Sequence, residues 1–124
     1  MNQILAIACG GAIGAVLRFW MSSGVHALFG RGFPYGTLSV NVLGCLLMGL
    51  LYVWLLERTA LAAEWRAFVL VGLLGGFTTF SSFSIETLTL IESGELLKAV
   101  MNVLLSVLVC LAATWIGLTM GRQL

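Results

Sequence analysis

The amino-acid sequence predicts an all-α membrane protein with four transmembrane helices. Hydrophobic residues make up 60% of its 124 residues and charged residues only 9%, whereas a soluble domain carries about 25% charged residues. The charges are also clustered, since none interrupts residues 32–56, 67–85 or 99–121. Each of these runs approaches or exceeds the roughly 18 apolar residues that mark a membrane span.

Charged and turn-forming residues mark where one span ends and the next begins. The only proline, Pro34, lies in a glycine-rich stretch that predicts a loop, and charged residues recur at positions 57–66 and 92–95. We expect four spans, at about residues 4–28, 36–56, 67–91 and 97–120. Because the connections are short, neighbouring spans should run antiparallel and form a single transmembrane domain over residues 1–124, multi-pass in the cell's inner (plasma) membrane.

The third span contains a stretch that is unsuited to a continuous helix in lipid. Residues 75–83 read Gly-Gly-Phe-Thr-Thr-Phe-Ser-Ser-Phe. Glycine weakens a helix interior, and Ser and Thr offer the backbone competing hydrogen bonds. Since every freed backbone group in hydrocarbon needs a partner, broken backbone survives only inside protein or along a wet cavity. The sequence therefore predicts a third helix broken mid-membrane, with an ion or substrate site at the break.

The Lys and Arg residues give almost no preference for one orientation in the membrane. With four spans, both termini share the side of Arg58, Arg66 and Arg122, and the other side holds Arg31 and Lys98. Orientation follows such a bias, so two interpretations stay open: one weakly set orientation, or insertion both ways with pairing as an antiparallel, dual-topology homodimer. Small residues suited to close helix contact favour assembly: Gly10, Gly11, Gly14, Ala15, Gly44, Gly49, Gly117 and Gly121.

Polar side chains occur at membrane depth in the first, second and fourth spans. Arg18 either snorkels to an interface or points inward, where it attracts anions or pairs with a carboxylate. Thr37, Asn41 and Cys45 are four residues apart and share a helix face. Asn41 there either joins helices or donates hydrogen bonds to an anion. The fourth span carries a polar stripe with the same spacing, which either makes interhelical hydrogen bonds or lines a pore. Its residues are Asn102, Ser106, Cys110 and Thr114.

The third span carries side chains that also have two interpretations. Phe80 and Phe83 are three residues apart, and such aromatic side chains usually serve packing. The positive edge of a phenyl ring can also touch a small anion, with the Ser81 hydroxyl adding a hydrogen bond. Glu86 is either a proton-coupling carboxylate or a partner for nearby hydroxyls and Arg18. Unwound backbone at the break would free carbonyls, which suit a small cation.

Other classes of function find little support. The net charge of +1 gives no argument for nucleic-acid binding. The single histidine, His26, has no nucleophile or metal-ligand partner at motif spacing, so no enzyme activity is expected. Cys9, Cys45 and Cys110 lie in three different spans with no metal-motif spacing, and we interpret them as buried packing thiols.

Three motifs resemble those of the Fluc (CrcB) fluoride-channel family. They are Gly-Ala-Val-Leu-Arg-Phe at residues 14–19, Gly-Thr-Leu-Ser-Val-Asn-Val-Leu-Gly at 36–44, and the stretch at 75–83. The resemblance covers essentially the whole chain. It implies a dual-topology antiparallel homodimer in the lipid bilayer, with two pores that pass fluoride passively out of the cytoplasm. It also implies a structural sodium ion at the dimer interface, bound by the backbone carbonyls of Gly75 and Thr78.

The resemblance further implies roles for individual side chains. Phe80 and Phe83 match phenylalanines whose ring edges approach fluoride, Asn41 matches a pore asparagine, and Arg18 matches a vestibule arginine. Cys110 falls in a polar track on the last span, although a thiol is a weaker donor than a hydroxyl. Polar pore-lining contributions are implied for Thr37, Ser81, Ser106 and Thr114.

The residues favour a channel over a proton-coupled exporter. Fluoride is strongly hydrated, so its path must replace water closely with hydrogen-bond donors and still release the ion at successive sites. The alternative is an exporter of the small multidrug resistance type, which also forms four-span, dual-topology dimers but depends on a carboxylate in the first span. Here the first span carries Arg18, and the only deep carboxylate is Glu86.

Overall fold

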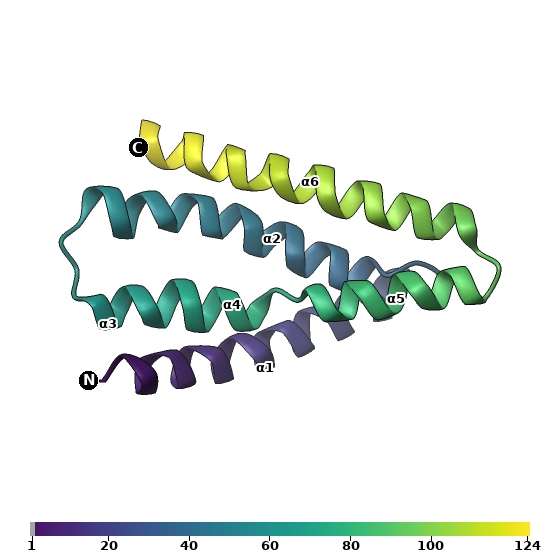
Figure 1. The fold of residues 1–124 in the computed structure, drawn as a ribbon, viewed down its shortest axis with the longest axis horizontal. Helices are drawn as coiled ribbons and strands as arrows, with labels where there is room; N and C mark the ends of the chain where they lie inside the picture. The colour runs from purple at the N-terminus through teal and green to yellow at the C-terminus, as the bar shows by residue number, and fades with distance from the viewer. Residues whose placement is uncertain (1) are drawn as a thin grey trace.

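The computed structural model describes residues 2–124, which form four long helical spans joined by short loops (Figure 1). Each span is long and apolar enough to cross a membrane, and the described residues contain no strand. The predicted all-helical, four-span architecture is therefore confirmed. The elements are α1 (Gln3–Phe29), α2 (Tyr35–Tyr52) with a π-helical extension (Val53–Arg58), α3 (Ala63–Arg66), a π-helical segment (Ala67–Leu73), α4 (Leu74–Phe77), α5 (Phe80–Glu92) and α6 (Leu96–Gln123).

Caps and turn residues set the ends of the first span. Asn2 Oδ1 accepts a hydrogen bond of 2.7 Å from the Ile4 N–H and so caps α1. At the other end, Gly30 has φ of 84°, a conformation that favours glycine, and its N–H donates to the His26 carbonyl at 2.8 Å. Pro34 stands immediately before α2, where its missing N–H costs no helical hydrogen bond. The short turns bring both ends of the chain to one end of the bundle (Figure 1).

Helices α2 and α6 run side by side in the same direction (Figure 1). A Cβ atom on Gly49 would overlap the carbonyl oxygen of Thr114, so only glycine allows this approach of the two backbones. Towards the ends of the two spans, Arg122 Nη2 lies 3.2 Å from Glu57 Oε2, across a sequence separation of 65 residues. Both contacts follow one register, in which a residue of the second span faces the residue 65 positions later in α6.

Helix α1 packs against the third span through glycines in the same way. A Cβ atom on Gly10 would overlap the Phe68 carbonyl oxygen, and one on Gly14 would overlap that of Leu73. Gly10 and Gly14 therefore permit close helix packing within one chain. The small residues of α1 consequently give no independent support for contact between chains.

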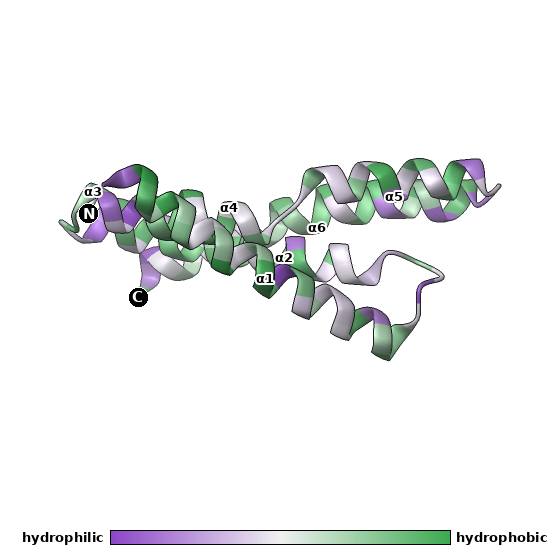
Figure 2. Cartoon of the chain, turned by 90° about the horizontal axis from the view of Figure 1, so that it is seen from below, coloured by the Kyte–Doolittle hydropathy of each residue, from purple (hydrophilic) through white to green (hydrophobic). Residues whose placement is uncertain are grey.

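The outer surface of the bundle is largely apolar. Phe19 and Trp20 are each 66% exposed and Leu28 is 82% exposed. Figure 2 shows hydrophobic colour along most of the helices and hydrophilic colour mainly at the ends of the bundle. An exposed apolar surface of this length is typical of helices that lipid or further protein surrounds.

The third span is divided into two helical parts by an extended link. Helix α4 ends at Phe77, and Thr78 and Thr79 have ψ of 159° and 120°, outside the helical region. Helix α5 begins at Phe80, with Thr79 as its N-cap, because Thr79 Oγ1 accepts a hydrogen bond of 3.1 Å from the Ser82 N–H. The link lies within the predicted stretch of residues 75–83.

Candidate functional site

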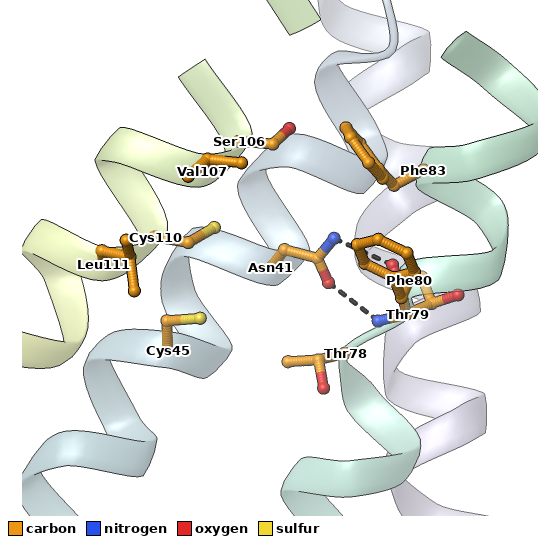
Figure 3. A pocket seen from close by; sticks show the side chains of 10 residues that line it. All are labelled: Asn41, Cys45, Thr78, Thr79, Phe80, Phe83, Ser106, Val107, Cys110 and Leu111. Carbon is orange, nitrogen blue, oxygen red and sulfur yellow. Dashed lines mark hydrogen bonds between the residues drawn. The ribbon is translucent and has the colours of Figure 1, made fainter. Parts of the chain in front are cut away.

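A cavity of about 360 Å³ lies beside the extended link (Figure 3). It is bounded by α2, the link, the start of α5 and the middle of α6. Seven of the residues named in the sequence analysis meet there, together with three others. The lining residues are Asn41, Cys45, Thr78, Thr79, Phe80, Phe83, Ser106, Val107, Cys110 and Leu111.

The side chain of Asn41 holds the link in place. Its Nδ2 donates to the Thr79 carbonyl at 3.0 Å, and its Oδ1 accepts from the Thr79 N–H at 2.8 Å. Figure 3 shows both hydrogen bonds from α2 to the link. The amide thus satisfies both backbone groups of a residue that has left the helix. One of the two Nδ2 hydrogens is not needed for these bonds, so Asn41 keeps a donor at the cavity.

The link changes the partners of the backbone groups on either side of it. In a continuous α-helix, the Thr79 and Ser82 N–H groups would bind the carbonyls of Gly75 and Thr78. Here they donate to Asn41 Oδ1 and Thr79 Oγ1 instead. The carbonyls of Gly75 and Thr78 are therefore both released from their helical partners.

Arg18 satisfies a third carbonyl at the same place. Its Nε donates to the Gly76 carbonyl at 3.0 Å, across the interface between α1 and α4. Arg18 also borders a second cavity, of about 130 Å³. Its lining is mostly polar and consists of Arg18, Phe19, Ser22, Ser23, Thr37, Thr79 and Ser82.

The two phenylalanines of the site stack loosely beside the first cavity. The ring centroids of Phe80 and Phe83 are 5.2 Å apart and their planes are inclined by 44°. Phe80 is 77% exposed, so most of this ring is not covered by its own chain. Ser81, between them, is exposed; its Oγ lies 3.2 Å from Thr79 Oγ1 and does not border the first cavity.

The remaining polar residues of the sequence analysis are spread along the bundle. Thr37 borders the second cavity and donates a hydrogen bond to Glu86 Oε1. Glu86 thus has a hydroxyl partner. Among the described residues it forms no ion pair with Arg18, since the two ion pairs there join Lys98 to Glu95 and Arg122 to Glu57.

The polar stripe on α6 divides between two roles. Asn102 is buried and its Nδ2 donates to Thr87 Oγ1 at 2.9 Å, joining α6 to α5. Ser106 borders the first cavity, whereas Thr114 donates to the Cys110 carbonyl at 3.0 Å within its own helix. Asn102, the first residue of the stripe, therefore joins α6 to α5. Ser106 and Cys110, in the middle of the stripe, border the first cavity.

Sequence reasoning missed two features of the site. Thr79 received no role, although a Thr that follows glycines and precedes a new helix is a common N-cap. The sequence also does not predict the convergence of Cys45 and Cys110 on one cavity. Only the relative register of α2 and α6 reveals it, and neither helix encodes that register alone.

Known proteins resemble this chain over its whole length. The family described as CrcB-like protein, Camphor Resistance (CrcB), matches residues 5–118. A relative from Geobacter sulfurreducens is 52% identical over 124 residues, which cover all of both chains, and one from Shewanella amazonensis is 55% identical over 94% of each. A third, from Methylococcus capsulatus, is 60% identical, but the chain spans only 54% of its length. All three bear the name fluoride-specific ion channel FluC. The chain is accordingly a multi-pass membrane protein that belongs to the CrcB family.

Proposed function

We propose that this protein is a fluoride-selective passive channel that exports fluoride across the inner membrane. The observation that carries the proposal is the first cavity. An amide donor, a serine hydroxyl and two phenyl rings line it beside the break in the third span. The names of its full-length relatives describe the same function. The protein has no enzymatic role in this proposal, because a channel transforms no substrate.

Fluoride would exchange its water for contacts with the cavity lining. Asn41 keeps one N–H for the ion, and Ser106 adds a hydroxyl on the facing helix. The edges of Phe80 and Phe83 carry partial positive charge and give weak contacts that release the ion readily. Such a sequence of weak sites permits conduction, and a narrow aromatic passage disfavours a larger anion.

The other polar residues extend the route at either end. Arg18 and Thr37 border the second cavity, which we propose as the vestibule where anions gather. Ser81 is exposed next to Phe80, and we propose that its hydroxyl contacts the ion outside the first cavity. Thr114 lies four residues beyond Cys110 on α6 and continues the polar stripe.

The working channel would be an antiparallel, dual-topology homodimer with two pores and with the break at mid-membrane. The first cavity is open on one side, and Phe80 there is 77% exposed, so a single chain supplies only part of a wall. A second copy in the opposite orientation would cover that side. The nearly even distribution of Lys and Arg, three at one end and two at the other, suits insertion both ways.

A sodium ion would bind the carbonyls that the link releases. Backbone oxygens are ligands that suit small hard cations, and the carbonyls of Gly75 and Thr78 have lost their helical partners. Two carbonyls from each of two chains would hold one ion at the interface. Bound there, sodium supplies positive charge that stabilises both interrupted helices.

Fluoride efflux from liposomes tests the channel. Vesicles containing the purified protein and potassium fluoride should release fluoride only when a potassium ionophore balances the charge, with equal pH on both sides. Efflux that requires a proton gradient and disappears in Glu86→Gln would instead identify a proton-coupled exporter. Vesicles that retain fluoride under both conditions would refute transport of this ion.

A further inference from the structure

Two thiols from adjacent helices line the first cavity. Gly49 of α2 lies against Thr114 of α6, and one helical turn before each of them stand Cys45 and Cys110. The separation of Cys45 and Cys110 matches the register of 65 residues that the pair Glu57 and Arg122 also follows. The close backbone approach at Gly49 keeps these neighbouring turns together.

The cysteine side chains are oriented towards the same space. Both residues line the first cavity, and Figure 3 shows their sulfur atoms turned towards its interior from adjacent helices. Both are free thiols of intermediate exposure. Cys9, the third cysteine, is exposed on α1 and lies outside this lining.

The lining restricts which ions two such thiols would accept. Among residues 2–124, no group of three or more His, Cys, Asp or Glu side chains converges, so the four protein ligands of a structural zinc site are missing. Val107 and Leu111 make the wall next to the thiols apolar, which disfavours hard cations that keep their water. Soft cations that prefer sulfur and accept two ligands remain.

We propose that Cys45 and Cys110 form a dithiol site for a soft, thiophilic cation in the wall of the first cavity. Each thiol loses its proton to water and each sulfur forms one bond to the metal, so a divalent ion gives a neutral bis-thiolate without oxidation or reduction. The bound ion lies one turn from Asn41 and from Ser106 and narrows the passage between them. Its effect on conduction, unlike the binding itself, rests on the proposed channel function.

Mercuric chloride is a direct probe of this site. The test uses a Cys9→Ser protein, which removes the thiol outside the cavity and keeps the pair. After washing with excess monothiol, this protein should retain about one mercury ion per chain, because two-point binding resists exchange. The further replacement Cys45→Ser or Cys110→Ser should weaken retention about 100-fold, since the second bond is lost. Equal retention in the single-thiol proteins, or none in the parent, would overturn the dithiol site.

Fluoride efflux provides a second and separable measurement. Mercury should inhibit efflux in the Cys9→Ser protein, a dithiol reagent should restore it, and the inhibition should disappear when Cys45 and Cys110 are both Ser. Each variant is compared with its own efflux before mercury. If no preparation conducts fluoride, the channel proposal fails while retention still decides the metal site. If a protein that conducts fluoride retains mercury and its efflux is not inhibited, the bound ion does not lie in the fluoride pathway.

Discussion

The amide of Asn41 makes two hydrogen bonds to the backbone of Thr79, one to its N–H and one to its carbonyl, and so substitutes for the helix that ends there. The second span thereby carries the side chain that keeps the third span in two parts. Asn41 therefore fixes the extended link, and in the proposed channel the same amide also binds the ion.

Replacing Asn41 by Asp should impair both tasks. The carboxylate still accepts from the Thr79 N–H, but it cannot donate to the Thr79 carbonyl, and the loss of this hydrogen bond costs about 1 kcal/mol. The added negative charge also repels an anion. We expect a lower thermal midpoint and almost complete loss of fluoride efflux. Ser39→Ala is the matched control, since Ser39 on the same helix bonds only to the Gly36 carbonyl; similar losses in both variants would contradict a specific role of the amide.

Replacing Phe80 by Ile should separate conduction from assembly. Phe80 is 77% exposed, so its removal leaves the packing within the chain nearly unchanged. Loss of the ring edge should cripple fluoride efflux while crosslinking still detects paired subunits. Phe29→Ile is the control, because it changes another exposed ring, 67% accessible, at the end of α1. Normal efflux in Phe80→Ile would remove the argument from ring edges.

Sodium removal should silence the channel without separating the subunits. The released carbonyls of Gly75 and Thr78 need a partner, and in the proposal sodium provides it. Replacement of sodium by a large organic cation should therefore stop efflux, and sodium should restore it. Chemical crosslinking measures pairing under both conditions. Undiminished efflux in carefully sodium-free vesicles would exclude a required sodium ion.

A methyl group at Gly49 should destabilise the fold. Its Cβ would overlap the Thr114 carbonyl oxygen, so α2 and α6 must move apart, at a cost of about 1–3 kcal/mol. Thermal unfolding in detergent measures the effect of Gly49→Ala. Gly24→Ala is the control, because no atom lies within 4 Å of a Cβ there and alanine favours the helix. A larger loss in the control than in Gly49→Ala would contradict the close packing.

The sequence predicted the four spans well because charge is excluded from lipid-spanning segments, so gaps between charged residues mark the helices. The stretch of residues 75–83 also contained the link between α4 and α5, since its glycines and hydroxyls do not favour helix. The register of α2 against α6 was not predictable, because it depends on a glycine in one helix meeting a carbonyl in the other. Without that register, the convergence of Cys45 and Cys110 on one cavity does not follow.

The roles assigned to individual pore residues stay predictions. Asn41, Phe80, Phe83 and Ser106 do share a cavity, which is the arrangement that their proposed roles need. The partner chain would decide the rest of the lining, and a single sequence carries no information on which faces of two copies meet.

The Nε of Arg18 donates its hydrogen bond to the neutral Gly76 carbonyl. Among residues 2–124, no carboxylate forms an ion pair with this guanidinium. A full positive charge therefore persists beside the second cavity. Coulomb attraction from such a charge reaches farther in dilute electrolyte, where the Debye length grows. The capture of anions from bulk water should accordingly quicken as ionic strength falls, even though nothing in the passage itself has changed.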